Sequence, residues 1–591
     1  MASASTPPPT PLAADDRPAW KLACPEQAQV AELRRRHDLS ELLCVLLANR
    51  GFEAGDTTLR HLGPDLANLH DPFLLPDMEA ATERLKRAID GGETILIHGD
   101  YDVDGVTGTA LLVRLLRLVG AKVEWHIPNR FTDGYSFGDH SIAKAEATGA
   151  TLVISVDNGT SAKETIDALL ERGIETIVTD HHEPPRGELP KAVAIVNPKL
   201  PTSQYPFREL CGGAVAFKLA WGLAQKISGA SKVTPKLREF LMDAMGLVAI
   251  ATVCDVVPLV DENRVLARWG LKALGASRHP GVRALLEVCD LAQPGRRLGG
   301  EDVGFQIGPR INASGRLATA AAAVDVLLAE TPEEGRRLSA ELDAMNVERK
   351  RIERALTAEA MVAMESFADP VANPVLVVSG QGWHQGVIGI VASRLVDAFG
   401  RPAIVIGLDG DTGRGSARSI PGFDLLGAMH AASDHFERYG GHAMAAGCEV
   451  RADAVDAVRE KVCAAAAEAL ANAPRPPLDI DAEFSLADLD ETAMGQLDRL
   501  EPFGALNEKP VLLSRGVRLA EPPRVIGADR SHLLLSVRHG ERVHKALAFG
   551  MARRVHELAM GEPIDLVYTP RWNWFRGQVN LELITLDFAR G

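Results

Sequence analysis

The stretch His98-Gly-Asp-Tyr-Asp-Val-Asp-Gly105 decides the fold class of this chain of 591 residues. It follows directly on the apolar run at residues 94–97, which predicts a buried parallel strand, and its two glycines predict the turn that ends this strand. Three carboxylates and one imidazole therefore lie at the carboxyl end of a strand. In open α/β sheets, ligands bind at that end.

Two further apolar strands end in side chains of the same kind. Residues 152–156 precede Asp157-Asn158, and residues 176–179 precede Asp180-His181-His182. Because parallel strands in register bring their carboxyl ends together, we expect these acids and imidazoles to meet in one crevice. A single Asp-x-Asp pair is more often a solvated turn, but three such strand ends in succession favour a functional site.

Strands and amphipathic helices alternate from residue 78 to about residue 330. This pattern predicts βαβ units and a doubly wound parallel sheet, so the fold class is α/β. A charged helix of more than 30 residues follows, beginning at Thr331-Pro332, then a second α/β region, and finally five short strands that predict an OB-like barrel. The expected segments are a disordered tail (1–20), an N-terminal helical segment (21–77), a first α/β domain (78–330), a connector helix (331–368), a second α/β domain (369–472) and the OB-like domain (473–591).

The charge of the chain is mild evidence against a nucleic-acid binder, because the net charge is -15 and the pI is near 5.6. A local basic groove can still exist in an acidic protein. Residues 501–591 hold 13 Lys and Arg against 10 Asp and Glu, a local charge of +3 (13 minus 10). This small change of sign favours the OB-like domain as a platform for single-stranded nucleic acid.

Cysteine usage and the N-terminal segment predict a cytoplasmic protein. The seven cysteines are scattered and form no Cys-x-x-Cys pair, so we expect them to be reduced and mostly buried. The first 16 residues are rich in Pro, Ala, Ser and Thr and do not have the pattern of a signal peptide. The most apolar stretch, residues 245–254, is too short to span a membrane, so we expect no membrane association.

The predicted ligand set is rich in oxygen and contains imidazoles, which suits Mn²⁺ or Mg²⁺ better than a structural zinc ion. A Ca²⁺ loop fits less well, because no Glu closes a twelve-residue loop. Asp255, which follows the apolar stretch, has two interpretations. It either approaches the strand ends from the end of a helix or caps a helix or turn.

Taken together, His98-x-x-x-Asp102-x-Asp104, Asp157-Asn158, Asp180-His181-His182 and Asp255 resemble the four motifs of the DHH phosphoesterase superfamily. Residues 308–316, 383–389 and 440–447 resemble the RecJ branch of this superfamily, which comprises single-strand-specific exonucleases. The resemblance implies that the first α/β domain is a DHH catalytic domain, the second a DHHA1 substrate-binding domain and the C-terminal domain an OB fold.

The resemblance also implies a pair of ions, Mn²⁺ or Mg²⁺, as cofactor. Asp157 would bridge the two ions, His182 would contact the scissile phosphate or protonate the leaving oxygen, and Asp180 would orient a histidine. Asp100 would be a further ligand or act just outside the ligand shell, and we assign catalytic roles to Asp157, His182 and Asp100. The implied metal ligands are His98 and Asp102 for one ion, Asp104, His181 and Asp255 for the other, and the bridging Asp157.

Substrate binding calls for cations, backbone N–H groups and aromatic rings. Arg310 and Arg316 could instead pair with an acid in the core. The aromatic residues near Trp574 could instead pack in a core or an interface. The glycine-rich turns of the second α/β domain could instead serve only to form the turns. The candidates are Arg310, Asn312, Arg316, His384, Arg414, Ser416, Arg418, Ser419, Gly441, His442, Trp574 and Arg576.

The expected function is a 5′-to-3′ exonuclease that releases mononucleotides from single-stranded DNA in recombination and repair. The resemblance implies a single-strand binding protein and a RecQ-type helicase as partners, and we expect a monomer. One alternative is a DHH phosphodiesterase for small substrates such as nanoRNA, cyclic dinucleotides or pyrophosphate. The other is a non-catalytic scaffold derived from a nuclease, although such a scaffold is expected to have lost ligands that this chain retains.

Overall fold

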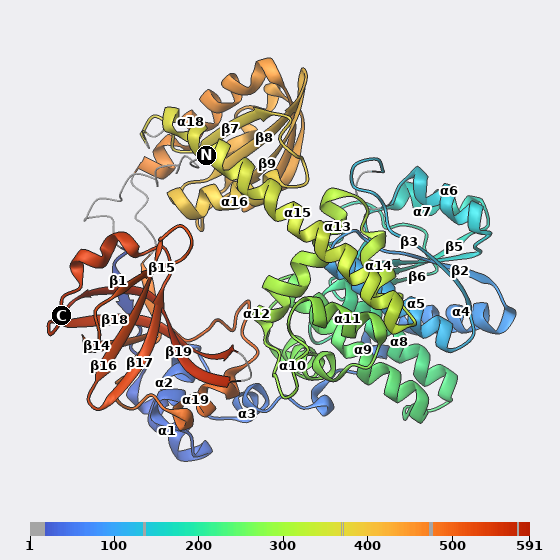
Figure 1. Ribbon diagram of the computed structural model, residues 1–591. Coiled ribbons are helices and arrows are strands. Elements are labelled where there is room, and N and C mark those ends of the chain that lie inside the picture. Colours follow the sequence, from blue (N-terminus) through green and yellow to red (C-terminus); the bar gives the residue numbers. More distant parts are fainter. Residues whose placement is uncertain (1–17, 134–136, 368, 370, 472–476, 576–577) are drawn as a thin grey trace. The chain divides into compact units, whose positions relative to one another are not determined.

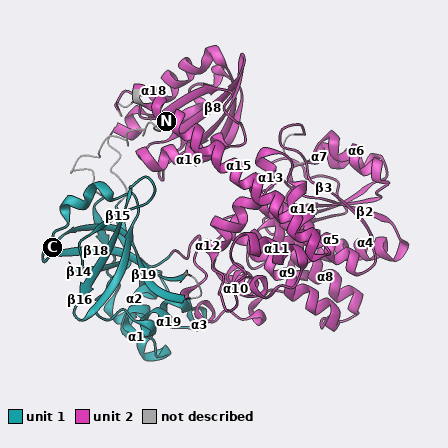
Figure 2. Ribbon diagram, in the orientation of Figure 1, with its two compact units in different colours: residues 1–58, 472–499, 509–591 teal, residues 59–471, 500–508 magenta. Residues whose placement is uncertain are grey.

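The structure is a computed structural model that describes residues 18–133, 137–367, 369, 371–471, 477–575 and 578–591 (Figure 1). The chain forms two compact units. Unit 1 comprises residues 1–58, 472–499 and 509–591, and unit 2 comprises residues 59–471 and 500–508 (Figure 2). Most of the expected tail at residues 1–20 lies outside the described residues. Within the described parts of the chain, none of the helices is both long and apolar enough to cross a membrane.

Unit 2 contains the parallel sheet that the sequence predicts. Its five strands lie in the order β3-β2-β4-β5-β6, and every neighbouring pair is parallel. The α/β fold class is thereby confirmed. The strands are β2 (Thr94–His98), β3 (Lys122–His126), β4 (Leu152–Val156), β5 (Glu175–Thr179) and β6 (Ala194–Val196).

Helices cover both faces of this sheet. Successive residues of a strand point to opposite sides, so each apolar strand contributes to a core on each face. Ile95 and Ile97 of β2 belong to the larger core, and Leu96 between them belongs to a second, smaller core. The sheet is therefore doubly wound, as predicted. The larger core contains α4 (Met78–Gly91), α5 (Val103–Leu118), α8 (Gly212–Ser228) and α9 (Pro235–Cys254), and the smaller one contains α6 (Asp139–Thr148) and α7 (Lys163–Glu171).

The strand order reverses at β2. The chain leaves β2 for β3 on one side and returns to β4 on the other, where His98 lies beside Ser155 in register. The loops that follow β2 and β4 therefore diverge. Such a reversal is the place where open α/β sheets bind ligands.

A long helix, α15 (Pro332–Met364), connects this sheet to the second one (Figure 1). As predicted, it begins after Thr331, whose side-chain oxygen accepts a hydrogen bond from the N–H of Glu334 at 3.2 Å. It contacts helices of the first α/β domain along its first part, and α16 (Ile388–Phe399) and β7 (Leu376–Gln381) further on. Those helices are α11 (Pro280–Val288), α13 (Gly308–Leu317) and α14 (Ala321–Leu328), and α10 (Asp261–Ala276) packs against α9.

The second sheet has the order β10-β11-β9-β8-β7, in which only β7 and β8 are parallel. Helix α16 packs on one face, and α17 and α18 share the core on the other face. The elements are β7 (Leu376–Gln381), α16 (Ile388–Phe399), β8 (Ala403–Asp409), β9 (Thr412–Arg418), α17 (Leu425–His430), β10 (Phe436–His442), β11 (Ala445–Arg451) and α18 (Val455–Ala471).

Unit 1 contains the C-terminal barrel. Its sheet runs β13-β14-β18-β19-β17-β16-β15, and an additional pairing of β14 with β16 closes it, which confirms the OB-like prediction. The strands are β13 (Ala482–Glu483), β14 (Leu512–Leu519), β15 (Arg524–Ile526), β16 (His532–His539), β17 (Arg542–Ala548), β18 (Pro563–Phe575) and β19 (Gln578–Arg590), with α19 (Glu491–Leu497) preceding β14.

The N-terminal residues pack on this barrel, a partner that the sequence did not reveal. Strand β1 (Trp20–Leu22) runs parallel to β12 (Leu478–Ile480). Nδ2 of Asn49, at the end of α2 (Glu41–Asn49), donates to the carbonyl of Asp481 at 2.6 Å. The expected helices do form, and unit 1 also contains α1 (Gln27–His37).

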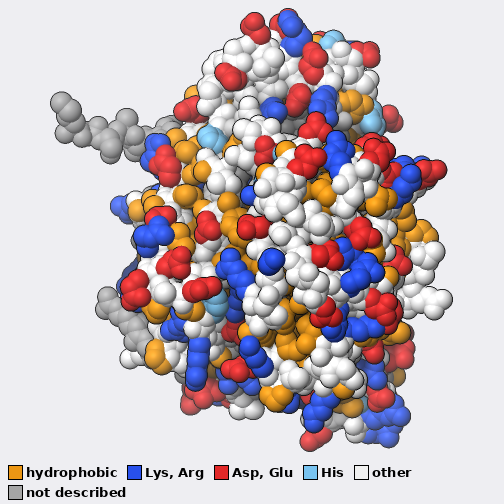
Figure 3. Space-filling view, turned by 90° about the vertical axis from the view of Figure 1, so that its right-hand side faces the viewer, with side chains coloured by type: hydrophobic (Ala, Val, Ile, Leu, Met, Phe, Trp, Pro, Cys, Tyr) orange, Lys and Arg blue, Asp and Glu red, His pale blue; other side chains and the backbone are white. Residues whose placement is uncertain are grey.

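Surface charge is mixed on the face shown in Figure 3. Basic and acidic side chains are interspersed there, with apolar side chains between them. The negative net charge of the chain therefore does not give this face a single sign.

Candidate metal centre

Asp102 and Asp104 are fixed by the ends of two helices. Oδ1 of Asp102 accepts a hydrogen bond from the N–H of Gly105 at 3.0 Å and so caps α5. Asp104, only 1% exposed, accepts hydrogen bonds from the N–H groups of Gly212 and Gly213, each at 2.6 Å. These donors begin α8, where a helix favours a negative charge.

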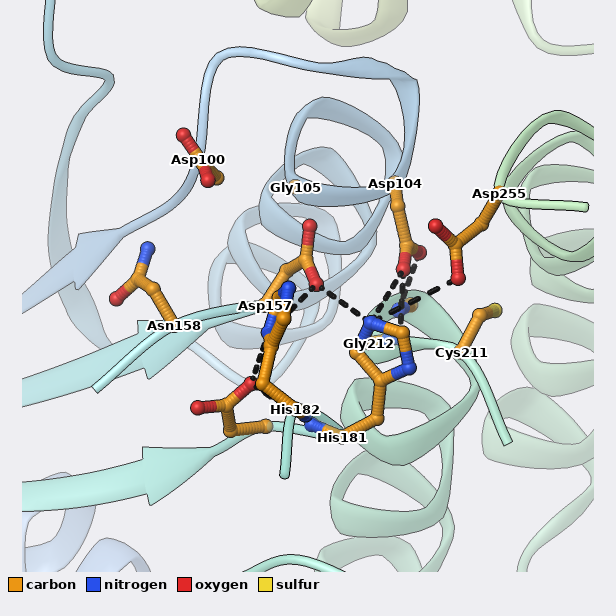
Figure 4. Close-up of polar contacts among 12 residues, drawn as sticks. Asp100, Asp104, Gly105, Asp157, Asn158, His181, His182, Cys211, Gly212 and Asp255 are labelled. Atoms are coloured by element: carbon orange, nitrogen blue, oxygen red, sulfur yellow. Dashed lines mark hydrogen bonds and ion pairs between the residues drawn. The ribbon is translucent and has the colours of Figure 1, made fainter. Parts of the chain in front are cut away.

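Asp157 leaves β4 in a left-handed backbone conformation, with φ at 64°, which turns its side chain toward Asp104 and His181 (Figure 4). The chain at Gly212 approaches it so closely that a Cβ there would lie 2.5 Å from Cβ of Asp157. The absence of a side chain at position 212 therefore leaves room for Asp157, and the backbone N–H of the same residue donates to Asp104.

The imidazole of His181 faces three carboxylates (Figure 4). Its Nε2 lies 3.1 Å from Oδ1 of Asp157, 3.6 Å from Oδ2 of Asp255 and 3.9 Å from Oδ2 of Asp104. Among the described residues, Oδ1 of Asp157 and Oδ2 of Asp255 are buried and have no hydrogen-bond partner. Ligand atoms about 2.1 Å from a Mg²⁺ ion in an octahedral site are about 3 Å apart, so this spacing fits a shared cation.

Asp255 reaches this cluster from the end of α9, which is one of the two positions that the sequence allows for it. It directly follows Cys254, the last residue of the helix, and its side chain points toward His181 (Figure 4). Because Oδ2 of Asp255 accepts no hydrogen bond from the described part of the chain, this oxygen does not act as a cap.

The electrostatics of the cluster favour a cation. Burial raises the pKa of Asp104 and of Asp157 well above the usual range. The negative charge of a neighbouring carboxylate raises it further, that of Asp255 for Asp104 and that of Asp104 for Asp157. Burial, with the charge of Asp102 next, also raises the pKa of Asp100 and of Asp255 to about 7. A divalent cation would offset this repulsion, so the residues present fit a metal centre.

His182 lies at the exposed rim of the cluster, with 59% of its side chain accessible. Its Nδ1 donates to Oδ1 of Asp180 at 2.8 Å, and this hydrogen bond raises the pKa of His182 to about 9. Burial alone would raise the pKa of Asp180, but the hydrogen bond and the charge of His182 lower it. Asp180 therefore holds a positively charged imidazole beside Asp157.

Two other predicted residues stand apart from these contacts. Oδ1 of Asp100 accepts a hydrogen bond from the N–H of Tyr101, and Asp100 lies away from the dashed contacts of Figure 4. His98 is fully buried, and its Nε2 lies 2.9 Å from Oγ of Ser141. Among the residues that the structure describes, no ion pair joins His98 to a carboxylate, and its ring contacts two other histidines instead.

The arginines of α13 differ in their surroundings. Arg310 pairs with Asp343 of α15 at 2.8 Å and also donates to two backbone carbonyls, which agrees with its structural alternative. Arg316 donates to the carbonyl of Gly386 at 3.2 Å. Burial lowers the pKa of Arg316 to about 10, and the charges of three arginines lower it further: Arg130, Arg349 and Arg418. Asn312, also on α13, is half-buried.

The predicted residues of the second sheet share one face. Arg414, Ser416 and Arg418 alternate along β9, and Ala445 of β11 pairs with both Arg418 and His442 of β10. Residues opposite one another in an antiparallel pair point to the same side. The remaining candidates of this domain lie nearby in the chain: Gly441 precedes His442, Ser419 donates to the carbonyl of Phe423 at 2.7 Å, and Nδ1 of His384 accepts from the N–H of Gly386 at 3.1 Å.

In the barrel, Trp574 lies on β18 and is half-buried. Nε1 of its neighbour Trp572 donates to the carboxylate of Asp498 at 3.1 Å, so this tryptophan packs within unit 1. Arg576 lies outside the described residues.

Sequence reasoning missed the residues that position the site. The N–H donors of Gly212 and Gly213 come from a helix that starts more than 100 residues after Asp104, and nothing in a Gly-Gly pair predicts such a contact. His126 and Arg130 could have been found from the sequence. His126 ends β3 and Arg130 follows it, just as the predicted ligands lie at or after the ends of β2, β4 and β5.

Three family models match the chain. The DHH family, N-terminal domain, matches residues 94–252, the DHHA1 domain matches residues 372–468, and the RecJ OB domain matches residues 480–587. The chain is 35% identical over 575 residues to the single-stranded-DNA-specific exonuclease RecJ of Bacillus subtilis (strain 168). That alignment covers 96% of this chain and 70% of the relative.

Two solved structures of RecJ from Thermus thermophilus resemble the fold. The complex with Mn²⁺ has a TM-score of 0.78 and 30% sequence identity, and it covers 98% of this chain and 80% of that chain. The complex with Mg²⁺ has a TM-score of 0.74 and 28% identity, and it covers 98% of this chain and 79% of that chain.

We predict that Gly212→Ala weakens Mn²⁺ binding by about 100-fold, because the new methyl group displaces Asp157. Overpacking is expected to lower the free energy of unfolding by about 1–3 kcal/mol, which leaves the fold intact. Isothermal titration with Mn²⁺ measures the affinity. The matched control is Gly275→Ala in α10, where the added Cβ would meet atoms no closer than 3.8 Å. Wild-type affinity in Gly212→Ala would contradict this account of the site.

Proposed function

Because this chain belongs to the RecJ family of the DHH phosphoesterase superfamily, we propose that it is a single-stranded-DNA-specific exonuclease. In this proposal it hydrolyses phosphodiester bonds from the 5′ end, releases 5′-mononucleotides and acts in recombination and repair. The observation that carries the proposal is the convergence of three carboxylates on one imidazole nitrogen where the strand order reverses. The polarity and the product rest on the family resemblance.

The proposed cofactor is a pair of Mn²⁺ or Mg²⁺ ions. The chemistry that such a pair supplies when bound is polarisation of the scissile phosphate and a lowered pKa of the attacking water. In this assignment Asp100 takes the place that the resemblance gives to His98. The charge of Asp102 acts on Asp100 and that of Asp100 acts on Asp157, whereas His98 contacts histidines and no carboxylate in the described chain. Asp104, His181 and Asp255 would hold one ion, Asp100 and Asp102 the other, and Asp157 would bridge them.

His182 is the proposed contact for the scissile phosphate and the proton donor to the leaving oxygen. It is protonated at neutral pH because Asp180 raises its pKa to about 9, and its exposed position leaves the ring accessible to a substrate. A charged imidazole can both bind a phosphate oxygen and release a proton to it. Asp180 would act through His182, because the hydrogen bond from Nδ1 keeps the ring charged and fixes its orientation.

The proposed phosphate grip combines Arg316 with the second sheet. Three neighbouring arginines act on Arg316, which indicates a positive region, and Arg418 is one of them. A Cβ at Gly389, in the first turn of α16, would lie 2.9 Å from Oγ of Ser416 and 3.1 Å from the guanidinium of Arg418. The start of a helix thus lies beside a cation and a hydroxyl, a combination that suits a phosphate.

The presence of the barrel favours a long single strand, and not a dinucleotide, as the substrate. OB-like barrels bind single strands by stacking bases on aromatic rings and by charge. The half-buried Trp574 is the proposed stacking residue, and Arg576, two positions later in the sequence, is the proposed cation. We also propose that the chain acts as a cytoplasmic monomer beside a single-strand binding protein and a RecQ-type helicase.

We predict that the purified protein with Mn²⁺ releases mononucleotides from 5′-labelled single strands at the start of a time course. With 3′-labelled strands, the labelled nucleotide is expected only at the end. Asp157→Asn should lower the rate by at least about 100-fold, because it removes the carboxylate shared by the ions. Asp90→Asn, an exposed change on α4, is the matched control. Faster turnover of dinucleotides than of long strands would favour the small-substrate alternative, and an inactive wild-type protein would favour the scaffold.

A second prediction separates His182 from the metal ligands. His182→Gln should lower the single-turnover rate by about 10²–10⁴-fold through the loss of acid catalysis, while Mn²⁺ affinity stays unchanged. Asp180→Asn should lower the rate less, and the double variant should be no slower than His182→Gln alone, because Asp180 acts through His182. Glu183→Gln, next in the chain and exposed, is the control. Loss of Mn²⁺ affinity in His182→Gln, or fully additive rates, would contradict these roles.

A further inference from the structure

Three histidines converge on one side of the carboxylate centre. His98 ends β2 and His126 ends β3, and the two residues are partners in the register of these parallel strands. His140 lies in the first turn of α6. The three ring centroids are 5.2, 5.4 and 5.7 Å apart. The fold itself therefore brings these rings together, from two strand ends and one helix start.

Nitrogen atoms of the three rings lie close together. Nε2 of His126 lies 3.2 Å from Nδ1 of His140. Oγ of Ser141 lies 2.9 Å from Nε2 of His98 and 3.4 Å from Nδ1 of His140, so this hydroxyl joins the group. Each histidine offers a nitrogen such that all three lie within 4.8 Å of one another. In a tetrahedral site with Zn–N distances of 2.0–2.1 Å, the nitrogens are about 3.3 Å apart, close to the separation of His126 and His140.

The chemistry of this group differs from that of the carboxylate centre. Its donors are three imidazoles and one hydroxyl, whereas the carboxylate centre combines one imidazole with several aspartates. Imidazole-rich sites suit Zn²⁺ and related transition metals, whereas carboxylate-rich sites suit Mg²⁺ and Mn²⁺.

We propose that His98, His126 and His140 bind a divalent transition-metal ion, Zn²⁺ in the first place, at a site separate from the carboxylate centre. The hydroxyl of Ser141 or a water molecule completes the four ligands. The bound ion ties the carboxyl ends of β2 and β3 to α6. Because β2 leads directly into the loop that carries Asp100 and Asp102, the ion also holds the root of this loop.

The test is Zn²⁺ binding to the full chain after treatment with a chelator. Competition with a chromophoric chelator, in excess Mg²⁺ to occupy the carboxylate centre, measures stoichiometry and affinity. We expect one Zn²⁺ per chain in the wild type and in Asp157→Asn. We expect affinity at least about 100-fold lower in His126→Gln and in His140→Gln, since each removes a ligand. His430→Gln, which changes an exposed histidine of α17, should bind as the wild type does.

A second readout covers a variant that folds poorly. In the same excess of Mg²⁺, Zn²⁺ should raise the melting temperature of the wild type and of Asp157→Asn, but not that of either histidine variant. Co²⁺ in place of Zn²⁺ should give the visible absorption of a four-coordinate ion in the wild type and lose it in both variants. If His126→Gln is unfolded, His140→Gln decides. Tight Zn²⁺ binding in a folded histidine variant, absence of binding in the wild type, or loss of binding in Asp157→Asn would overturn the proposal.

Discussion

The structure depends on how several buried carboxylates are kept close together. Asp104, Asp157 and Asp255 surround one nitrogen of His181, and burial raises the pKa of all three carboxyl groups. Such a group is costly in a protein interior unless cations or hydrogen-bond donors compensate the charge. Two N–H donors at the start of α8 compensate part of the charge at Asp104, and a pair of divalent ions would compensate the rest.

The fold provides this arrangement through strand order. Because β2 and β4 are neighbours while the chain between them visits β3, their loops diverge and leave room for side chains from four separate segments. Close backbone contact then sets the geometry, since Gly212 lies against Asp157 and donates to Asp104. The same sheet edge continues to β3, where His126 and His140 join His98 in a group with a different metal preference.

Much of this was predictable from sequence because the signals are local. The strand at residues 94–97, the acids that follow it and the cap at Thr331 depend on neighbouring residues, and the structure has the elements as predicted. Long-range pairing was not predictable. The pairing of Arg310 with Asp343, and the packing of residues 18–58 on the barrel, depend on partners distant in sequence that no periodicity specifies. His98 illustrates the difference. Its position at the end of a strand was predicted from neighbouring residues, but its histidine neighbours, which are distant in sequence, were not.

The central claim is that the carboxylates and His181 hold a pair of ions between them. Anomalous diffraction at the manganese edge, from crystals soaked in Mn²⁺, tests this most directly. The account predicts two peaks about 3.5–4 Å apart, with a carboxylate oxygen of Asp157 beside each and His181 next to one of them. A single peak away from Asp157, or no peak among Asp104, Asp157 and Asp255, would contradict it.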